Sequence, residues 1–370
     1  MKIKVSYTTE KQTDAAVSAL KSDFSGMEIK AVLFFASSAF PPAELASAME
    51  KAFPGVSVFG CTTAGEICSG FMSENSIVAM AMTGGIIEDL RVEVLEDVKG
   101  NAKGALNKAM DAFHAHFKIP LSEMDFNKYV GLILIDGLSG TEEILMDAVG
   151  NVTNINIIGG SAGDDLKFAE TFVFAHGKAY SNAAMLALVK AAGPFSILKT
   201  QSFQILDKTL VATKVNEKNR EVIEFNGKSA VEAYAEAVGV PAEKASDAFM
   251  RYPIGLVING DPYVRSPQRI EGNSIIFYCN ILEGMELSLL ESTDIVADTQ
   301  KAVADMKNGM GSVSGIINFH CILRTLELKS KKQVGPYAAI FKDVPTVGFS
   351  TYGEELFGHI NQTSTMLLFA

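Results

Sequence analysis

The stretch VFGCTTAGE at residues 58–66 is decisive for the fold. In it, the end of an apolar run is followed by a turn of small residues and then by an acidic residue, Glu66. Upstream lies VLFFA at 32–36, a continuous apolar run typical of a strand buried on both faces. Between them, PPAELASAMEKAF places Leu45, Met49 and Ala52 at helical spacing. The order predicts a β-α-β unit that ends in a glycine turn at Gly60–Glu66.

The same order occurs twice more along the chain. VGLILI at 130–135 and INIIGG at 155–160 flank a helical segment, and the turn Gly159–Asp164 follows. GIINFHC at 315–321 and PTVGF at 345–349 flank a longer, less regular connection, and the turn Gly348–Glu354 follows. An apolar strand is expected to return after each turn, at 77–82, 171–175 and 365–369. A repeated order of this length predicts three copies of one structural unit.

The sequence between the second and third copies does not follow the repeated order. VATKV and EVIEF flank a polar turn at Asn216–Arg220 and predict antiparallel strands. SAVEAYAEAVG predicts a helix that ends at Gly239, and a later helix is expected between Ser292 and Gly309. We therefore expect a mixed α/β (α+β) protein whose repeated β-α-β units form mixed sheets layered with helices. Two domains are expected, at 1–200 and 201–370.

Composition excludes several classes of function. Acids number 43 against 32 basic residues, the net charge is −11, and no long Lys/Arg run occurs, so nucleic acid is not expected as a partner. No run of about 18 apolar residues occurs, so membrane insertion is not expected. The cysteines are scattered at 61, 68, 279 and 321, without zinc spacing. A cytoplasmic protein with reduced, unbridged thiols is the expectation.

The glycine turns are the strongest candidates for a binding site. Glycines let backbone N–H groups approach a ligand, and the hydroxyls of Thr62, Thr63, Ser161, Ser350 and Thr351 supply adaptable hydrogen bonds. The alternative is that the glycines only turn tightly and the acids cap the next segment. Three turns that converge on one site would favour binding.

Arginine, histidine and cysteine offer further candidates. Arg265 and Arg324 lie beside motif segments of an otherwise acidic chain, and arginine clamps carboxylates and phosphates. A haem needs only one histidine ligand and an apolar cavity, but the five histidines do not cluster in the sequence. Cys61 lies inside a glycine turn that could lower its pKa, although no basic partner is adjacent in sequence. No GxSxG, Walker or HExxH motif occurs, so no catalytic residue is assigned.

The combined motifs resemble those of the FIST proteins. VFGCTTAGEI at 58–67 and IIGGSAGDD at 157–165 look like the two glycine motifs of the N-terminal FIST domain. YVRS at 263–266, NFHCILR at 318–324, VGFSTYGEE at 347–355 and GHINQT at 358–363 look like hallmarks of the C-terminal FIST domain. The resemblance spans residues 25–370, nearly the whole chain.

The resemblance implies a bacterial, non-catalytic signal-transduction sensor that binds a small ligand, with amino acids a suggested class. It also implies that the signal passes to a separate signalling protein such as a histidine kinase. The alternative is a haem-binding nitric-oxide sensor that regulates such a kinase, and a thiol hydrolase using Cys61 ranks third. The candidate ligand-binding residues are Gly60, Cys61, Thr62, Thr63, Gly65, Gly160, Ser161, Arg265, Arg324, Ser350, Thr351 and Glu354.

Overall fold

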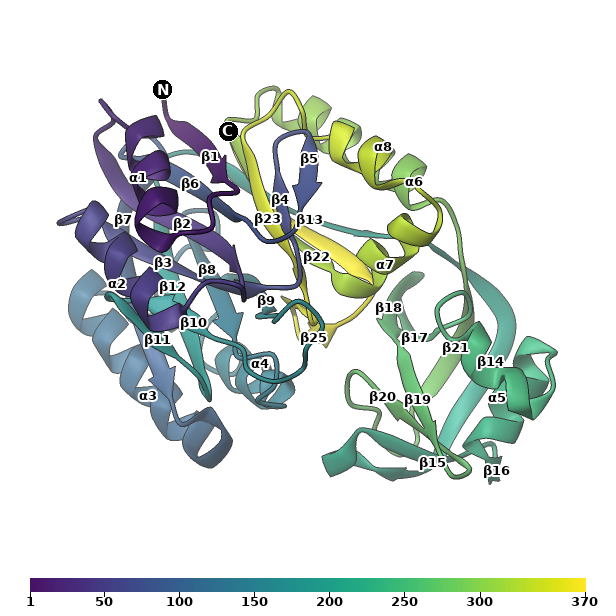
Figure 1. Cartoon of the computed structure of the whole chain (residues 1–370). Helices are drawn as coiled ribbons and strands as arrows, with labels where there is room; N and C mark the ends of the chain where they lie inside the picture. Colours follow the sequence, from purple (N-terminus) through teal and green to yellow (C-terminus); the bar gives the residue numbers. More distant parts are fainter. The chain divides into compact units, whose positions relative to one another are not determined.

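The computed structural model describes all 370 residues, which divide into two compact units (Figure 1). Unit 1 comprises residues 1–199, 300–359 and 364–370, and unit 2 comprises residues 200–299 and 360–363. The chain leaves unit 1 after Lys199, close to the boundary expected at 200/201, and re-enters that unit at Gln300. Both units mix helices with strands, so the predicted mixed α/β class with two domains is confirmed.

Unit 1 uses one order of elements three times: strand, helix, strand, helix, strand, hairpin, strand. The first repeat consists of β1 (Ile3–Thr8), α1 (Thr13–Asp23), β2 (Ile29–Ser37), α2 (Pro42–Ala52), β3 (Ser57–Thr63), the hairpin β4 (Glu66–Cys68) and β5 (Phe71–Ser73), and β6 (Ile77–Thr83). The second consists of β7 (Ile87–Glu96), α3 (Val98–Phe117), β8 (Tyr129–Ile135), α4 (Glu142–Gly150), β9 (Asn156–Ser161), the hairpin β10 (Val173–Ala175) and β11 (Lys178–Tyr180), and β12 (Ala183–Ala191).

The third repeat keeps the order but is modified in two places. It consists of β13 (Phe195–Gln201), α6 (Ile295–Met310), β22 (Gly315–Cys321), α7 (Ile322–Ser330), α8 (Val334–Ala339), β23 (Thr346–Thr351), the hairpin β24 (Glu354–Leu356) and β25 (His359–Ile360), and β26 (Thr363–Phe369). Two helices, α7 and α8, replace the single helix of the other repeats. Most of unit 2 is inserted between β13 and α6, where the first repeat has only a short connection.

Each repeat contributes the parallel centre of one sheet. The three orders are β1-β6-β2-β3-β10-β11, β7-β12-β8-β9-β24-β25 and β13-β26-β22-β23-β4-β5. In all three, the central pair is parallel, and the last strand of the repeat returns antiparallel to the first strand of that pair. The predicted internal repetition is therefore confirmed, with the most altered connection in the third copy.

The hairpins are exchanged between repeats. The hairpin β4–β5 of the first repeat joins the third sheet through β23, β10–β11 of the second joins the first sheet through β3, and β24–β25 of the third joins the second sheet through β9. The prediction of a returning strand at 171–175 was wrong, because that segment contains β10. Its apolar residues are buried in another repeat's sheet, and the strand that returns is β12.

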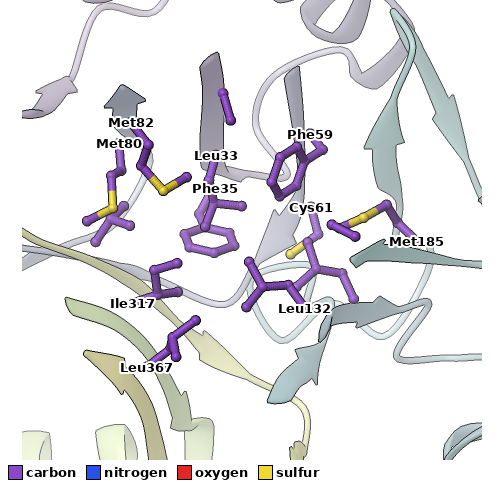
Figure 2. Packing of buried hydrophobic residues seen from close by; sticks show 14 of the residues in the cluster. Leu33, Phe35, Phe59, Cys61, Met80, Met82, Leu132, Met185, Ile317 and Leu367 are labelled. Atoms are coloured by element: carbon purple, nitrogen blue, oxygen red, sulfur yellow. The ribbon is translucent and has the colours of Figure 1, made fainter. Parts of the chain in front are cut away.

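The three sheets of unit 1 face a common hydrophobic core (Figure 2). Leu33 and Phe59 come from the first sheet, Leu132 from the second, and Ile317 and Leu367 from the third. Alternation along each strand sends the intervening side chains to the outer faces. On the first two sheets those faces are covered by α1 and α2, and by α3 and α4. On the third sheet, α7 and α8 contact the outer side chains.

Unit 2 is an antiparallel sheet with one main helix and its own core. Its strands are β14 (Phe203–Asn216), β15 (Glu221–Phe225), β16 (Lys228–Ser229), β17 (Ile254–Ile258), β18 (Asp261–Arg265), β19 (Pro267–Glu271), β20 (Ser274–Phe277) and β21 (Glu286–Ser292). As predicted, β14 and β15 pair antiparallel, and α5 (Ala230–Val238) ends at Gly239, whose φ is 82°. The expected helix limits at Ser292 and Gly309 were displaced: Asp294 accepts hydrogen bonds from Val296 N and Ala297 N, and α6 continues to Met310.

No helix in the structure combines the length and apolar character needed to span a membrane.

Candidate functional site

The three glycine turns are joined by backbone hydrogen bonds. Between the first and third turns, Ser350 N donates to Gly65 O at 2.7 Å and Ala64 N donates to Ser350 O at 3.2 Å. Between the second and first, Gly163 N donates to Thr62 O at 3.0 Å. The third and second turns complete the ring through Ser161 N to Gly353 O at 2.8 Å. The convergence that the sequence suggested is therefore present in unit 1.

One glycine in each turn allows the parallel strands to pair closely. Gly60, Gly159 and Gly348 occupy the same register position opposite Phe34, Ile133 and Asn318. A β-carbon on these glycines would lie 1.8, 1.7 and 2.1 Å from the carbonyl oxygen of the opposite residue. These glycines are thus required by strand packing. Gly65 differs, because its φ of +123° is a conformation that side chains rarely adopt.

The side chains of the ring largely satisfy one another. Thr63 Oγ1 donates to Glu66 Oε1 at 2.5 Å, and Thr351 donates to Glu354 with the same spacing of three residues. Glu66 also accepts from Ser76 N at 3.1 Å. Burial raises the pKa of Glu66 to about 7, although these hydrogen bonds lower it. The turn residues are buried, so the middle of the ring is a packed junction with no open surface.

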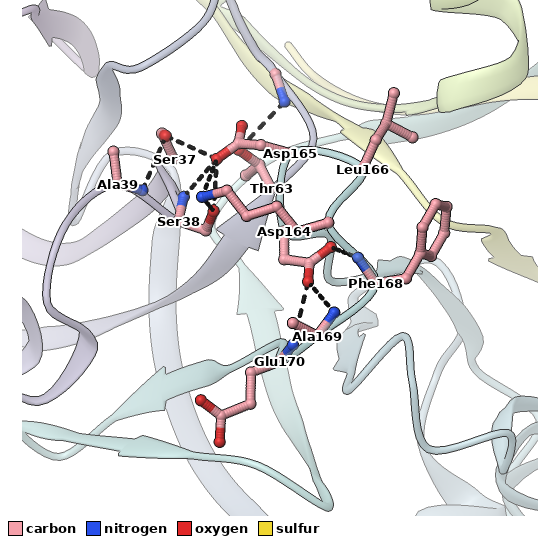
Figure 3. Close-up of polar contacts among 12 residues, drawn as sticks. Ser37, Ser38, Ala39, Thr63, Asp164, Asp165, Leu166, Phe168, Ala169 and Glu170 are labelled. Atoms are coloured by element: carbon pink, nitrogen blue, oxygen red, sulfur yellow. Dashed lines mark hydrogen bonds and ion pairs between the residues drawn. The ribbon is translucent and has the colours of Figure 1, made fainter.

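The second turn continues into a loop whose two aspartates accept hydrogen bonds from residues of the other two repeats; Figure 3 shows the contacts around these aspartates. The Asp164 carboxylate accepts backbone N–H groups from Phe168 at 2.9 Å and Ala169 at 2.6 Å, and it also accepts the Tyr352 hydroxyl at 2.5 Å. These hydrogen bonds outweigh desolvation, and the pKa of Asp164 is lowered. Asp165 accepts from Ser37 Oγ at 2.9 Å at the end of β2.

A cavity opens beside the junction of the first and third turns. Its volume is about 270 Å³, and its lining residues are Ala64, Gly65, Met72, Ser73, Glu74, Thr325, Lys329, Val334 and Ser350. Lys329 and Glu74 form an ion pair there, and both side chains are partly exposed. Pockets for drug-sized ligands occupy about 300–1,000 Å³, so this cavity suits a smaller molecule. It offers one cation, one anion and three hydroxyl groups.

The predicted site residues fall into three groups. Gly65 and Ser350 line the cavity. The buried ring beside the cavity holds Gly60, Cys61, Thr62, Thr63, Gly160, Ser161, Thr351 and Glu354. Arg324 lies in α7, one residue before the cavity residue Thr325, and is only 1% exposed. Arg265 belongs to β18 of unit 2, where its Nη1 donates to Val264 O at 3.4 Å.

The cysteines and histidines do not supply reactive or haem-binding groups at this cavity. All four cysteines are unbridged and buried, as predicted, and burial raises the pKa of Cys61 well above its ordinary value. A haem ligand must face an apolar cavity. His320 and His359 are enclosed by protein, the other histidines are exposed, and none lines this cavity. These residues do not fit a haem there.

Sequence reasoning missed Glu74, Ser73, Thr325 and Lys329. Lys329 belongs to a basic cluster that is visible in the sequence, but nothing in the sequence connects it to residue 74. The connection arises because the hairpin of the first repeat is paired with the sheet of the third. The only signal in the sequence is that each of the three repeats places a hairpin after its glycine turn, which could have indicated that all three hairpins pair in the same way.

Comparison with known proteins gives two findings. The FIST N domain family matches residues 30–228, and the FIST C domain family matches residues 230–356. The chain is also similar to a protein of Methanocaldococcus jannaschii named uncharacterized protein MJ1623, with 24% identity over 278 residues that cover 70% of this chain and 53% of that protein. The chain thus spans about half the length of this curated relative.

Proposed function

The chain belongs to the FIST family, and from this premise we propose that it is a sensor that binds a small amino acid-like ligand in the cavity between Glu74 and Lys329. FIST domains are generally associated with signal-transduction sensors that bind small ligands. The family points to a non-catalytic role, and the protonated, buried Cys61 thiol gives no support to a thiol hydrolase. Transfer of the signal to a separate partner protein is part of the proposal.

The ion pair at the cavity carries this proposal. An amino acid has an ammonium and a carboxylate on one carbon, and Glu74 and Lys329 offer the complementary charges within hydrogen-bonding distance of each other. Both side chains are partly exposed, and an exposed ion pair contributes only about 0–1 kcal/mol to stability. A ligand can therefore replace the Glu74–Lys329 ion pair with a small loss of free energy. Ser73, Thr325 and Ser350 supply neutral hydrogen-bonding groups on the inner side.

The experiment is a thermal-shift screen of the amino acids and haemin, followed by titration calorimetry. A ligand of the native state raises the melting temperature by mass action. Glu74→Gln and Lys329→Gln should each weaken amino acid binding by roughly 10- to 100-fold, from a loss of about 1.5–3 kcal/mol per charged hydrogen bond.

Lys301→Gln is the matched control. Lys301 forms a comparable surface ion pair with Asp305 at 2.6 Å but does not line this cavity, so binding should be unchanged. Equal affinities of Lys329→Gln, Lys301→Gln and the unmodified protein would rule out this cavity as the site.

A further inference from the structure

Comparison of the three repeats identifies where the third one departs from its scaffold. The outer face of each sheet has three buried positions in equivalent register, two on the first strand of the parallel pair and one on the last strand of the repeat. They hold Phe34, Ala36 and Ile77 in the first repeat, Ile133, Ile135 and Ala184 in the second, and Asn318, His320 and Ser364 in the third. All nine are buried. In two repeats these positions hold apolar side chains, so the packing of the sheet does not require polar side chains there. The polar side chains of the third repeat therefore need another explanation.

The polar residues form a chain of hydrogen bonds with a definite direction. Ser364 Oγ donates to Asn318 Oδ1 at 2.7 Å, and Asn318 Nδ2 donates to the Tyr337 hydroxyl at 3.4 Å. The Tyr337 hydroxyl lies 2.9 Å from His320 Nδ1. We assign the Tyr337 hydroxyl proton to this contact, which makes Nδ1 the acceptor and places the imidazole proton of His320 on Nε2.

His320 Nε2–H is a buried donor without a protein partner. The side chain is 0% exposed, and Nε2 has no hydrogen-bonding atom of the chain within reach. Burial, and then the positive charge of Arg324, lower the pKa of His320 well below its ordinary value, so the ring is neutral. A buried donor that lacks a hydrogen-bond acceptor is destabilising. A donor in positive surroundings is suited to an anionic acceptor.

The unpartnered donor lies next to the ligand cavity. His320 on β22 and Ser350 on β23 are register partners in parallel strands, so their side chains share the outer face, about 4.8 Å apart at the backbone. Ser350 lines the cavity, and its Oγ lies 2.8 Å from Thr325 Oγ1 on α7. The cavity residues Met72 and Ser73 lie on β5, further along the same sheet. Ser350 therefore joins the cavity lining to the strand position next to His320.

We propose that His320 is a specificity-determining residue whose Nε2–H binds a second carboxylate of the ligand, which makes the ligand an acidic amino acid. This inference rests on the proposed function. Lys329 and Glu74 bind the α-carboxylate and α-ammonium groups, and the side-chain carboxylate reaches inward past Ser350 and Thr325. Arg324 contributes positive potential at the inner end.

The test is titration calorimetry with glutamate, aspartate, glutamine, asparagine and alanine. Glutamate or aspartate should bind about ten-fold or more tightly than its own amide and than alanine. His320→Ile should remove this preference and leave the affinity for alanine unchanged. Ile135 occupies the equivalent position in the second repeat, so the sheet can accommodate this side chain, and the variant should fold with a lower stability because the Tyr337 hydroxyl loses its acceptor. His320→Gln keeps an N–H donor and should retain part of the preference.

A second measurement does not depend on the ligand. Nitrogen-15 NMR of the free protein should show His320 protonated at Nε2, and Tyr337→Phe should weaken that tautomer preference because it removes the proton donor to Nδ1. A proton on Nδ1 in the unmodified protein would overturn the inference.

The outcomes separate the two proposals. If alanine and glutamate bind equally and both depend on Lys329, the proposed function stands and the role of His320 is refuted. If no amino acid binds, the proposed function fails and this inference fails with it.

Discussion

Gly159→Ala tests whether the parallel strands of unit 1 require a glycine at the start of each turn. The new β-carbon would lie 1.7 Å from Ile133 O, and contacts below 3.0 Å are essentially never observed for real β-carbons. The strands would have to separate by more than 1 Å locally, which is incompatible with normal N–H···O distances in the ladder. Two or three lost ladder hydrogen bonds at about 1 kcal/mol each, plus about 1–3 kcal/mol for overpacking, give a destabilisation of roughly 3–6 kcal/mol.

The assay is thermal unfolding, followed by circular dichroism and calorimetry. At about 2–4 °C per kcal/mol for a unit of this size, the expected loss corresponds to a melting temperature lower by roughly 6–24 °C. Gly150→Ala is the control from the same repeat, because its β-carbon would meet nothing within 4 Å. That variant should be unchanged or more stable by about 0.4–1 kcal/mol. A Gly159→Ala protein that melts within 1–2 °C (roughly the effect of 0.5 kcal/mol) of the unmodified one would refute the packing argument.

Two further predictions concern buried titratable groups. Burial raises the pKa of Glu66 from 4.5 to about 7, so between these pH values the folded state holds a proton that the unfolded state has lost. Stability should therefore fall as pH rises from 4.5 to 7, by on the order of 3 kcal/mol, and Glu66→Gln should remove this slope in thermal melts; an unchanged slope would contradict the assignment. The thiol of Cys61 should resist a disulfide reagent at pH 8 in the folded protein and react after denaturation, because it is buried and its pKa is raised. Rapid reaction of Cys61 in the native state would show that the reagent reaches this thiol, and it would contradict the burial of the first glycine turn.

Much of unit 1 could be predicted because its central strands carry local signals. The apolar runs at 32–36, 130–135 and 315–321 are buried on both faces, and they became β2, β8 and β22. The glycines opposite them mark close strand pairing, which is also a local requirement. The strands of the exchanged hairpins have only two or three residues each, too few for periodicity to define. VFA at 173–175 is as apolar as a central strand, and only tertiary pairing shows that it belongs to a hairpin.

The candidate site was only half predictable for the same reason. Gly65 and Ser350 belong to motifs that the sequence displays three times. Glu74 and Lys329 are 255 positions apart and meet only because β4–β5 pairs with β23. The interpretation of His320 likewise needed the structure. The sequence shows a histidine within a strand, whereas the register shows that the equivalent residues are Ala36 and Ile135.

The hairpin exchange gives the cavity a property that a pocket within one repeat would lack. Glu74 reaches it from the first repeat, and Thr325, Lys329 and Ser350 come from the third. If a ligand replaced the Glu74–Lys329 ion pair, as proposed above, both repeats would contact it, and it would change a contact that joins them. The third repeat is also the one with the additional helix α8, the buried polar chain at His320 and the insertion of unit 2. Two repeats thus keep the apolar scaffold, and the departures from it occur in the third, which also supplies Thr325, Lys329 and Ser350 to the cavity.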